Sequence, residues 1–239
     1  MSAVVEQIMG MPIVVEVRDD AVTAGDLEPM FDWLRRVDET FSTYRDDSEI
    51  SRLDRGELEL ADAEPDVRWV LERCEQLRRE TNGFFDARAS GRLDPSGLVK
   101  GWAVDRAVDV LRAAELESFA LSAGGDMRVV GGPWRVGIEH PLERQGVAAV
   151  IEANDLAIAT SAAYARGDHV LDPHTGRAPA DVLSVTVLGP GLAAADAYAT
   201  AAFAMGARGA RWTATLDGYE ALTILADETV LTTAGFPGV

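Results

Sequence analysis

The pattern of hydrophobic and polar positions predicts several amphipathic helices. In the clearest one, which begins near Lys100, Val104, Ala107, Val108 and Leu111 fall at positions i, i+3, i+4 and i+7, so one helix face is apolar. The same spacing predicts further helices at residues 27–37 and 65–80. We also expect helices at 193–205, closed by Gly206, and at 208–216, and a short helical piece at 48–53.

Short β-rich runs between these helices predict antiparallel strands. Residues 11–18 are rich in β-branched side chains, and the pair Gly124-Gly125 between two such runs is typical of a hairpin turn. Other strands are predicted at 119–122, 127–130, 134–139, 147–152, 156–160, 183–188, 222–225 and 230–232. Because helices and strands do not alternate strictly as βαβ units, we expect an α+β fold of antiparallel sheets flanked by helices.

The composition narrows the range of ligands. The chain has 239 residues, enough for one large domain or two small, tightly joined ones. Forty acidic residues against 22 basic ones give a net charge of −18. Such a surface repels nucleic acid, anionic membranes and the diphosphate of a dinucleotide, so nucleic acid is not expected as a partner. A dinucleotide would need a local cation.

The single cysteine and the short apolar runs bear on the cellular location of the protein. Cys74 is the only cysteine, so no intrachain disulfide can form, and its predicted helical position favours a buried packing role. No run reaches the ~18 apolar residues of a membrane span. The N-terminus lacks a basic region followed by a long apolar core, so we expect no signal peptide and a cytoplasmic protein.

Two sets of residues could carry chemistry. Asp94 and Lys100 flank a tight turn at a helix N-terminus, which suits an anion, although many surface helices begin this way. Asp196 and Thr200 are four residues apart on one helix face, and their oxygens suit Mg²⁺. In the alternative interpretation, Asp196 caps or solvates its helix and Thr200 faces the core.

The chain has three histidines. His140 and His174 are expected in loops, whereas His169 lies just before a Pro/Gly turn. An unperturbed imidazole titrates near pH ~6.5 and can act as a general base, although a lone histidine is more often structural.

Six blocks, in order along the chain, resemble the FAD:protein FMN transferase (ApbE) family. They are MGM at Met9, FSTYRDDSEISRL at Phe41, GFFD at Gly83, LDPSGLVKGWAVD at Leu93, HVLDPHTG at His169 and ADAYAT at Ala195. The combination of HxxDPxTG with ADAxxT at this spacing is fairly specific, whereas MGM alone is not. The resemblance implies an ApbE-like, T-fold-related single compact unit over residues 1–239.

The resemblance also implies site residues. Mg²⁺ would be held by the Gly97 carbonyl and by the side chains of Asp196 and Thr200, and His169 stands at the family's motif histidine. The residues implied to contact FAD are Met9, Tyr44, Phe84, Phe85, Asp86, Asp94, Lys100 and Val170.

The chain departs from the family pattern at three places. Phe84 replaces the usual alanine, and Ala162 replaces a glycine in a T-S-G segment. Only residues 87–92 separate Asp86 from the block that begins at Leu93 and contains Asp94, where relatives carry a longer insertion, so we expect a pocket that is more open on that side.

The implied reaction is the Mg²⁺-dependent transfer of FMN from FAD to a threonine or serine hydroxyl of an acceptor flavoprotein, with release of AMP. Two alternatives remain open. One is an FAD pyrophosphatase in which water attacks instead and FMN and AMP are released. The other is a non-catalytic FAD-binding protein.

Overall fold

The computed structural model describes residues 2–20, 22–143, 146–162 and 170–238. In these ranges, eight strands form one antiparallel sheet in the order β1-β2-β3-β4-β7-β8-β9-β10, and β5 and β6 form a separate hairpin. The strands are β1 (Ser2–Ile8), β2 (Met11–Val17), β3 (Phe119–Ala123), β4 (Asp126–Val130), β5 (Trp134–Glu139), β6 (Val147–Ala153), β7 (Leu156–Ala162), β8 (Val182–Gly189), β9 (Glu220–Leu225) and β10 (Val230–Thr232).

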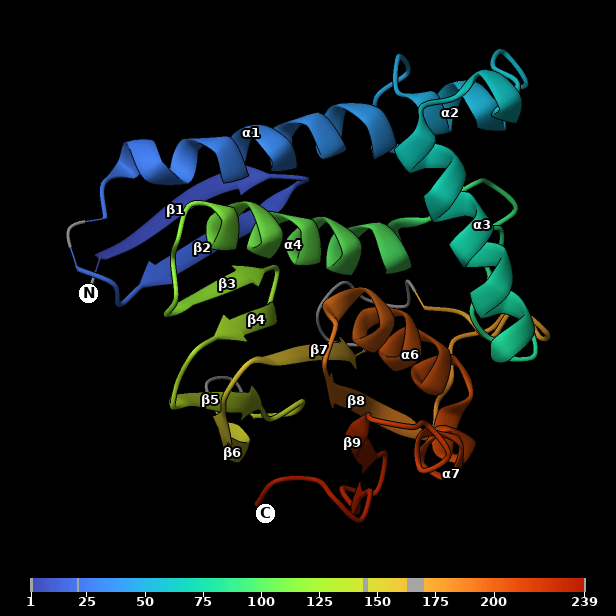
Figure 1. The fold of residues 1–239 in the computed structure, drawn as a ribbon. Helices are drawn as coiled ribbons and strands as arrows, with labels where there is room; N and C mark the ends of the chain where they lie inside the picture. Colours follow the sequence, from blue (N-terminus) through green and yellow to red (C-terminus); the bar gives the residue numbers. More distant parts are fainter. Residues whose placement is uncertain (1, 21, 144–145, 163–169, 239) are drawn as a thin grey trace.

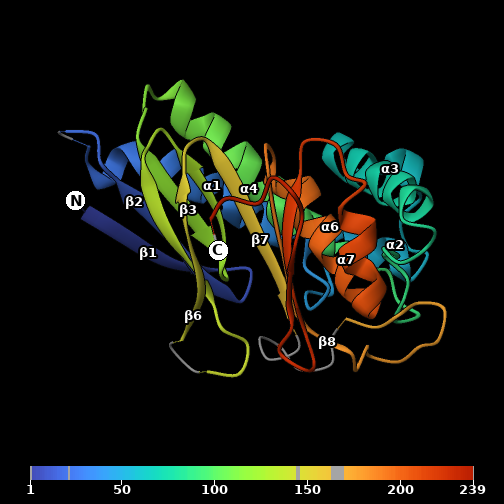
Figure 2. The same ribbon diagram turned by 90° about the horizontal axis from the view of Figure 1, so that it is seen from below.

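Helices cover one face of the large sheet. Figures 1 and 2 show α1 (Ala24–Phe41), α4 (Ser96–Ala113) and α6 (Leu192–Ala204) along this face, while α2 (Glu49–Asp54) and α3 (Pro65–Glu80) stand at one end. A short α7 (Gly209–Thr213) follows α6. Alternate residues of β2, namely Ile13, Val15 and Val17, are buried in the core between sheet and helices.

A second, smaller core lies on the other face of the sheet. Trp134, Ile138 and Ile151 of the β5–β6 hairpin pack with residues such as Ile158 and Leu188 of the large sheet. Both faces of the central strands are therefore covered, which explains why β8 is buried along nearly its whole length.

The closest approach of α4 and α6 fixes the geometry of the site. A Cβ added to Gly101 would lie 2.4 Å from the carbonyl oxygen of Leu192, so only glycine fits there. The carboxylate of Asp105, one turn further along α4, accepts the backbone N–H groups of Leu192 (3.0 Å) and Ala193 (2.8 Å). Asp105 thus caps the N-terminus of α6 from a neighbouring helix.

The structure confirms the α+β fold of antiparallel sheets flanked by helices. It also adds β1, which the sequence pattern did not predict, and it shortens the predicted helix at 208–216 to α7. In the described part of the chain, no helix is both long and apolar enough to cross a membrane.

Candidate functional site

A buried group of charges lies where α4, α6 and β4 meet. The Lys100 ammonium forms an ion pair with Asp126 Oδ2 and lies 3.5 Å from Asp196 Oδ1. The side chains of Asp126 and Asp196 are only 2% and 6% exposed. We call Lys100, Asp126 and Asp196 the acid–lysine cluster. Two carboxylates share one ammonium in it, so with both acids ionised the cluster carries one net negative charge.

Asp196 is the member of this cluster whose charged form is disfavoured by burial. Burial raises the pKa of its carboxyl to about 7; the nearby Asp126 also raises this pKa, while Lys100 and the Gly101 backbone amide lower it. Among the described residues, Asp196 Oδ2 has no hydrogen-bond partner. A buried carboxylate oxygen without a partner is costly, and a bound cation is one way to satisfy it.

The other two predicted metal ligands lie beside Asp196. Thr200 follows one turn later on α6, and its Oγ1 is 3.4 Å from Ser161 Oγ. A Cβ built on Gly97, in the first turn of α4, would lie 3.7 Å from Thr200 Oγ1 and 3.2 Å from the Phe85 ring. The structure therefore brings Gly97, Asp196 and Thr200 together at one end of the α4–α6 contact.

These groups fit Mg²⁺ chemically. A carboxylate, a hydroxyl and a backbone carbonyl are all hard oxygen ligands, and a set of three leaves positions for water and phosphate oxygens. In the described ranges, no three His, Cys, Asp or Glu side chains gather as a metal site. A cation held here would therefore depend on the hydroxyl and the carbonyl as well as on Asp196. The ligand roles stay predictions.

The segment before α4 is held by local hydrogen bonds. Asp94 Oδ1 accepts the Ser96 N–H at 3.0 Å, which forms the turn into the helix. The Asp94 N–H donates to the Ala87 carbonyl at 2.7 Å, and this bond closes the short 87–94 segment. Phe85 is buried beside Gly97, and Asp86 accepts the Arg88 N–H.

The Phe84 ring contacts two side chains, His174 and Arg208. Its ring packs edge-on against His174 at 4.6 Å between centroids, and the Arg208 guanidinium lies 5.3 Å from its centroid. His174 Nε2 is also 3.0 Å from the Asn82 carbonyl oxygen. His174 is exposed as predicted, but these contacts dock it against the turn that ends α3.

The remaining predicted FAD contacts lie nearer the surface. Met9 and Gly10 form the β1–β2 turn with φ of 54° and 70°, and Tyr44 is 97% exposed. Val170 is half-buried against the main core. Their flavin contacts stay predictions, and His169, the predicted general base, lies outside the described residues.

Sequence reasoning missed Asp126. It is the first residue of β4, directly after the Gly124-Gly125 turn, whose φ angles of 58° and 100° confirm the predicted hairpin. An acid at the start of a predicted strand reads as a solvated hairpin residue. Only the position of β4 beneath α4 shows that this acid faces Lys100.

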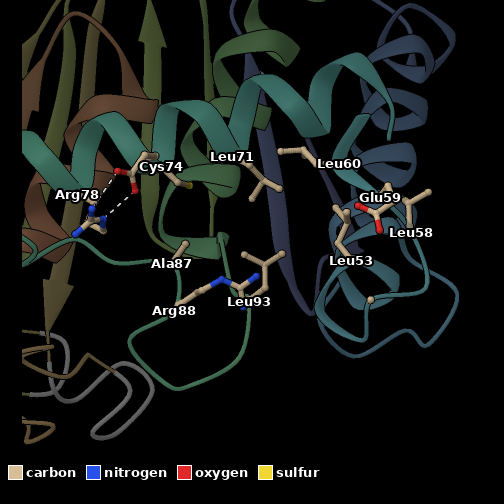
Figure 3. Close-up of a pocket in the computed structure, with 12 residues that line it drawn as sticks. Leu53, Leu58, Glu59, Leu60, Leu71, Cys74, Arg78, Ala87, Arg88 and Leu93 are labelled. Atoms are coloured by element: carbon tan, nitrogen blue, oxygen red, sulfur yellow. Dashed lines mark hydrogen bonds and ion pairs between the residues drawn. The ribbon is translucent and has the colours of Figure 1, made fainter. Parts of the chain in front are cut away.

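A separate cavity of about 420 Å³ lies between α2, α3 and the 87–93 segment. Figure 3 shows it lined by leucines such as Leu53 and Leu71, with Cys74 and Arg88 also on its wall. None of the predicted site residues lines this cavity. We place the functional site at the acid–lysine cluster, where the predicted groups meet.

Comparison with solved structures agrees with this fold. The structure of the flavin transferase ApbE from Vibrio cholerae matches with a TM-score of 0.86 and 25% identity, over 98% of this chain and 97% of that one. An ApbE protein from Thermotoga maritima also gives a TM-score of 0.86, at 21% identity and the same coverage.

Sequence comparison defines the family. The model of the ApbE family matches residues 9–91 and 87–223, and the chain belongs to this family. FAD:protein FMN transferase of Vibrio cholerae is 35% identical over 160 residues, which are 61% of this chain and 48% of that protein. The enzyme of the same name from Treponema pallidum is 32% identical over 173 residues, which are 62% of this chain and 48% of that enzyme. The chain spans about half the length of these curated relatives.

Proposed function

We propose that this chain is an FAD:protein FMN transferase, which uses Mg²⁺ to move FMN from FAD onto a threonine or serine hydroxyl of an acceptor protein. The observation that carries the proposal is that Gly97 of α4 lies beside Thr200 of α6, one turn after Asp196, whose Oδ2 has no hydrogen-bond partner among the described residues. The family membership and the names of the relatives support the same reaction.

In the proposed reaction, the acceptor hydroxyl oxygen bonds to the FMN-side phosphorus of FAD. The bond from that phosphorus to the bridging oxygen breaks, and AMP leaves with this oxygen. The hydroxyl proton passes to a base, for which His169 is the candidate. FMN remains on the acceptor through a phosphoester.

The residues at the site have distinct parts in the proposal. Asp196, Thr200 and the Gly97 carbonyl would hold the Mg²⁺, which when bound would offset charge on the diphosphate. Lys100 is an inadequate substitute for the metal, since Asp126 and Asp196 already surround its ammonium. Asp94 lies exposed at the turn into α4, where it can accept hydrogen bonds from the nucleotide.

A direct assay tests the proposal. The purified chain is incubated with FAD, Mg²⁺ and a cell extract containing acceptor proteins, and covalent flavin is detected by fluorescence of denatured protein bands. We expect a labelled acceptor band and one AMP released per flavin attached. Free FMN and AMP without any labelled band would show hydrolysis instead, and tightly bound intact FAD without turnover would show a binding protein.

The proposal also concerns the acceptor protein and the cellular location of the chain. Mass spectrometry of the labelled band would identify the acceptor and show whether a threonine or a serine carries the FMN. The cytoplasmic location stays a prediction, which fractionation of cells producing the full protein would test.

A further inference from the structure

Asp126 occupies a position that demands an explanation. It is 2% exposed, and it begins β4 next to β7, the strand that carries Thr160. The Thr160 backbone N–H donates to its Oδ1 at 2.9 Å, while its Oδ2 meets the Lys100 ammonium. Burial of a carboxylate at this depth is unfavourable unless both oxygens have partners. Asp126 Oδ1 has a hydrogen bond, and Oδ2 has the Lys100 ion pair as its one partner, with no further hydrogen bond among the described residues. The Asp126 carboxylate therefore depends on Lys100.

Lys100 is unequally shared between the two acids. Its Nζ is in direct contact with Asp126 Oδ2, whereas its separation from Asp196 Oδ1 is 3.5 Å. Asp126 Oδ2 and Asp196 Oδ2 both lack a hydrogen-bond partner among the described residues, but the Asp126 oxygen is in direct contact with the ammonium. The ammonium therefore compensates mainly Asp126, and Asp196 is the carboxylate of the pair that a second cation would compensate.

We propose that Asp126 is a positioning residue of the cation site: it holds and neutralises Lys100, so that Asp196 stays available to a divalent cation. This inference rests on the proposed function, because it assumes that the cation binds at Asp196. Without the Asp126 charge, Lys100 would be compensated by Asp196 alone, and the local charge would rise from −1 to zero. A divalent cation would then be attracted less and would compete with the ammonium.

The test measures cation binding without FAD. Binding of Mn²⁺ to the full chain is followed by the electron paramagnetic resonance signal of the free ion, and Mg²⁺ is followed by calorimetry. The variant is Asp126→Asn, because an amide oxygen can still accept the Thr160 N–H. We expect the dissociation constant to rise about tenfold, as for the loss of one nearby charge in partly buried surroundings.

Asp109→Asn is the matched control. Asp109 lies on the same helix, α4, but its side chain is 63% exposed and only 3.7 Å from Arg106. This variant removes the same unit charge from the molecule without touching the cluster. We expect its cation affinity to stay within about twofold of the parent, since exposed charges are screened. Equal weakening in both variants would mean that net charge alone acts, and would overturn the proposal.

Lys100→Met provides a second, opposite test. If the ammonium competes for Asp196, its removal should leave cation binding as tight as in the parent or tighter. Weaker binding in this variant would overturn the proposal even if Asp126→Asn failed to fold. Circular dichroism and the thermal midpoint are measured for each variant to identify such a failure.

The outcomes also separate this inference from the proposed function. A parent chain that binds neither cation, or an Asp196→Asn variant that binds as well as the parent, would remove the metal site and both ideas with it. Binding that depends on Asp196 but is unchanged in Asp126→Asn would overturn only the role of Asp126.

Discussion

At the scale of single residues, the site is defined by charges that water does not reach. Asp126 and Asp196 are buried and share Lys100, and the residual imbalance falls on one Asp196 oxygen. Such arrangements are unfavourable for folding alone and are common where a protein handles ions. Asp94 is different, because it is exposed and its Oδ1 accepts the Ser96 N–H.

The first prediction concerns Asp196. Asp196→Ala should abolish Mg²⁺-dependent turnover and leave the fold largely intact, because it removes a costly buried charge. Turnover is measured as AMP release, and the fold by circular dichroism. Activity near that of the parent would refute the metal assignment.

The same residue gives a pH-dependent prediction for the metal-free protein. The pKa of Asp196 is raised from 3.8 to about 7 in the fold, so protonated Asp196 favours folding at low pH and that contribution is lost as the pH rises from about 4 to about 7. Asp196→Asn should therefore gain stability relative to the parent over this window. Urea unfolding in EDTA at pH 5 and pH 8 measures the difference, and a constant difference would contradict the burial of the ionised group.

Cys74 should be chemically inert despite lining a cavity. Burial raises the pKa of its thiol to about 12, so very little thiolate exists at pH 8. We expect iodoacetamide to modify the native chain far more slowly than the urea-unfolded chain at pH 8. Mass spectrometry over time provides the measurement, and equal rates would show that the thiol is accessible and ionised.

At the scale of elements, the contact between α4 and α6 holds the site together. Asp105 caps the first N–H groups of α6, and its carboxylate is 3.3 Å from Arg128 Nε, while Arg128 Nη1 donates to the Pro190 carbonyl. Sheet, α4 and α6 are thereby joined at one point. The helices that present Gly97, Asp196 and Thr200 keep a fixed spacing as a result.

Gly101→Ala tests this spacing. In most helices alanine is more stable than glycine by about 1 kcal/mol. Here a new Cβ would meet the Leu192 carbonyl oxygen at 2.4 Å, so we expect a loss of roughly 1–3 kcal/mol from overpacking. Gly25→Ala in α1 is the control, since its Cβ would meet only Thr23 Oγ1 at 3.6 Å. Urea unfolding of both variants should give opposite signs, and a stabilised Gly101→Ala would contradict the close approach.

At the scale of the whole molecule, charge governs how a dinucleotide can bind. The chain carries −18 overall, and the cluster adds no net positive charge to receive a diphosphate. We expect FAD affinity to fall at least about tenfold when EDTA replaces Mg²⁺. Quenching of flavin fluorescence on binding provides the measurement. Equal affinity in both buffers would show that protein groups alone hold the diphosphate.

The parts of the fold that could be predicted from sequence are those determined by residues close together in the chain. Local periodicity predicted α1, α3 and α4, because each has an apolar face in the core. The alanine-rich α6 is buried on most sides, and Gly206 marked its end. The pairing of β4 with β7, and the separation of the β5–β6 hairpin from the large sheet, depend on contacts between distant segments and could not be read from local pattern. The strand β1 was not predicted, because its seven residues include Glu6 and Gln7 and its pairing with β2 cannot be seen in the local pattern.

The candidate site divides in the same way. The spacing of Asp196 and Thr200 on one helix indicated a pair of oxygens, and the family motifs supplied Gly97. Asp126 could not be predicted, since its role arises only where β4 passes under α4. Nor does spacing show that Phe84 already packs against His174 and Arg208.

The glycine contact between α4 and α6 has one more consequence. If Gly97, Asp196 and Thr200 hold a cation as proposed, their oxygens lie on two helices in close contact at Gly101 and Leu192, and the site would be formed before the ion binds. Little backbone rearrangement would accompany loading, so amide hydrogen exchange along both helices should be nearly the same with and without the ion. The selectivity between small and large divalent ions would then follow from a fixed opening, with Ca²⁺ disfavoured by its size.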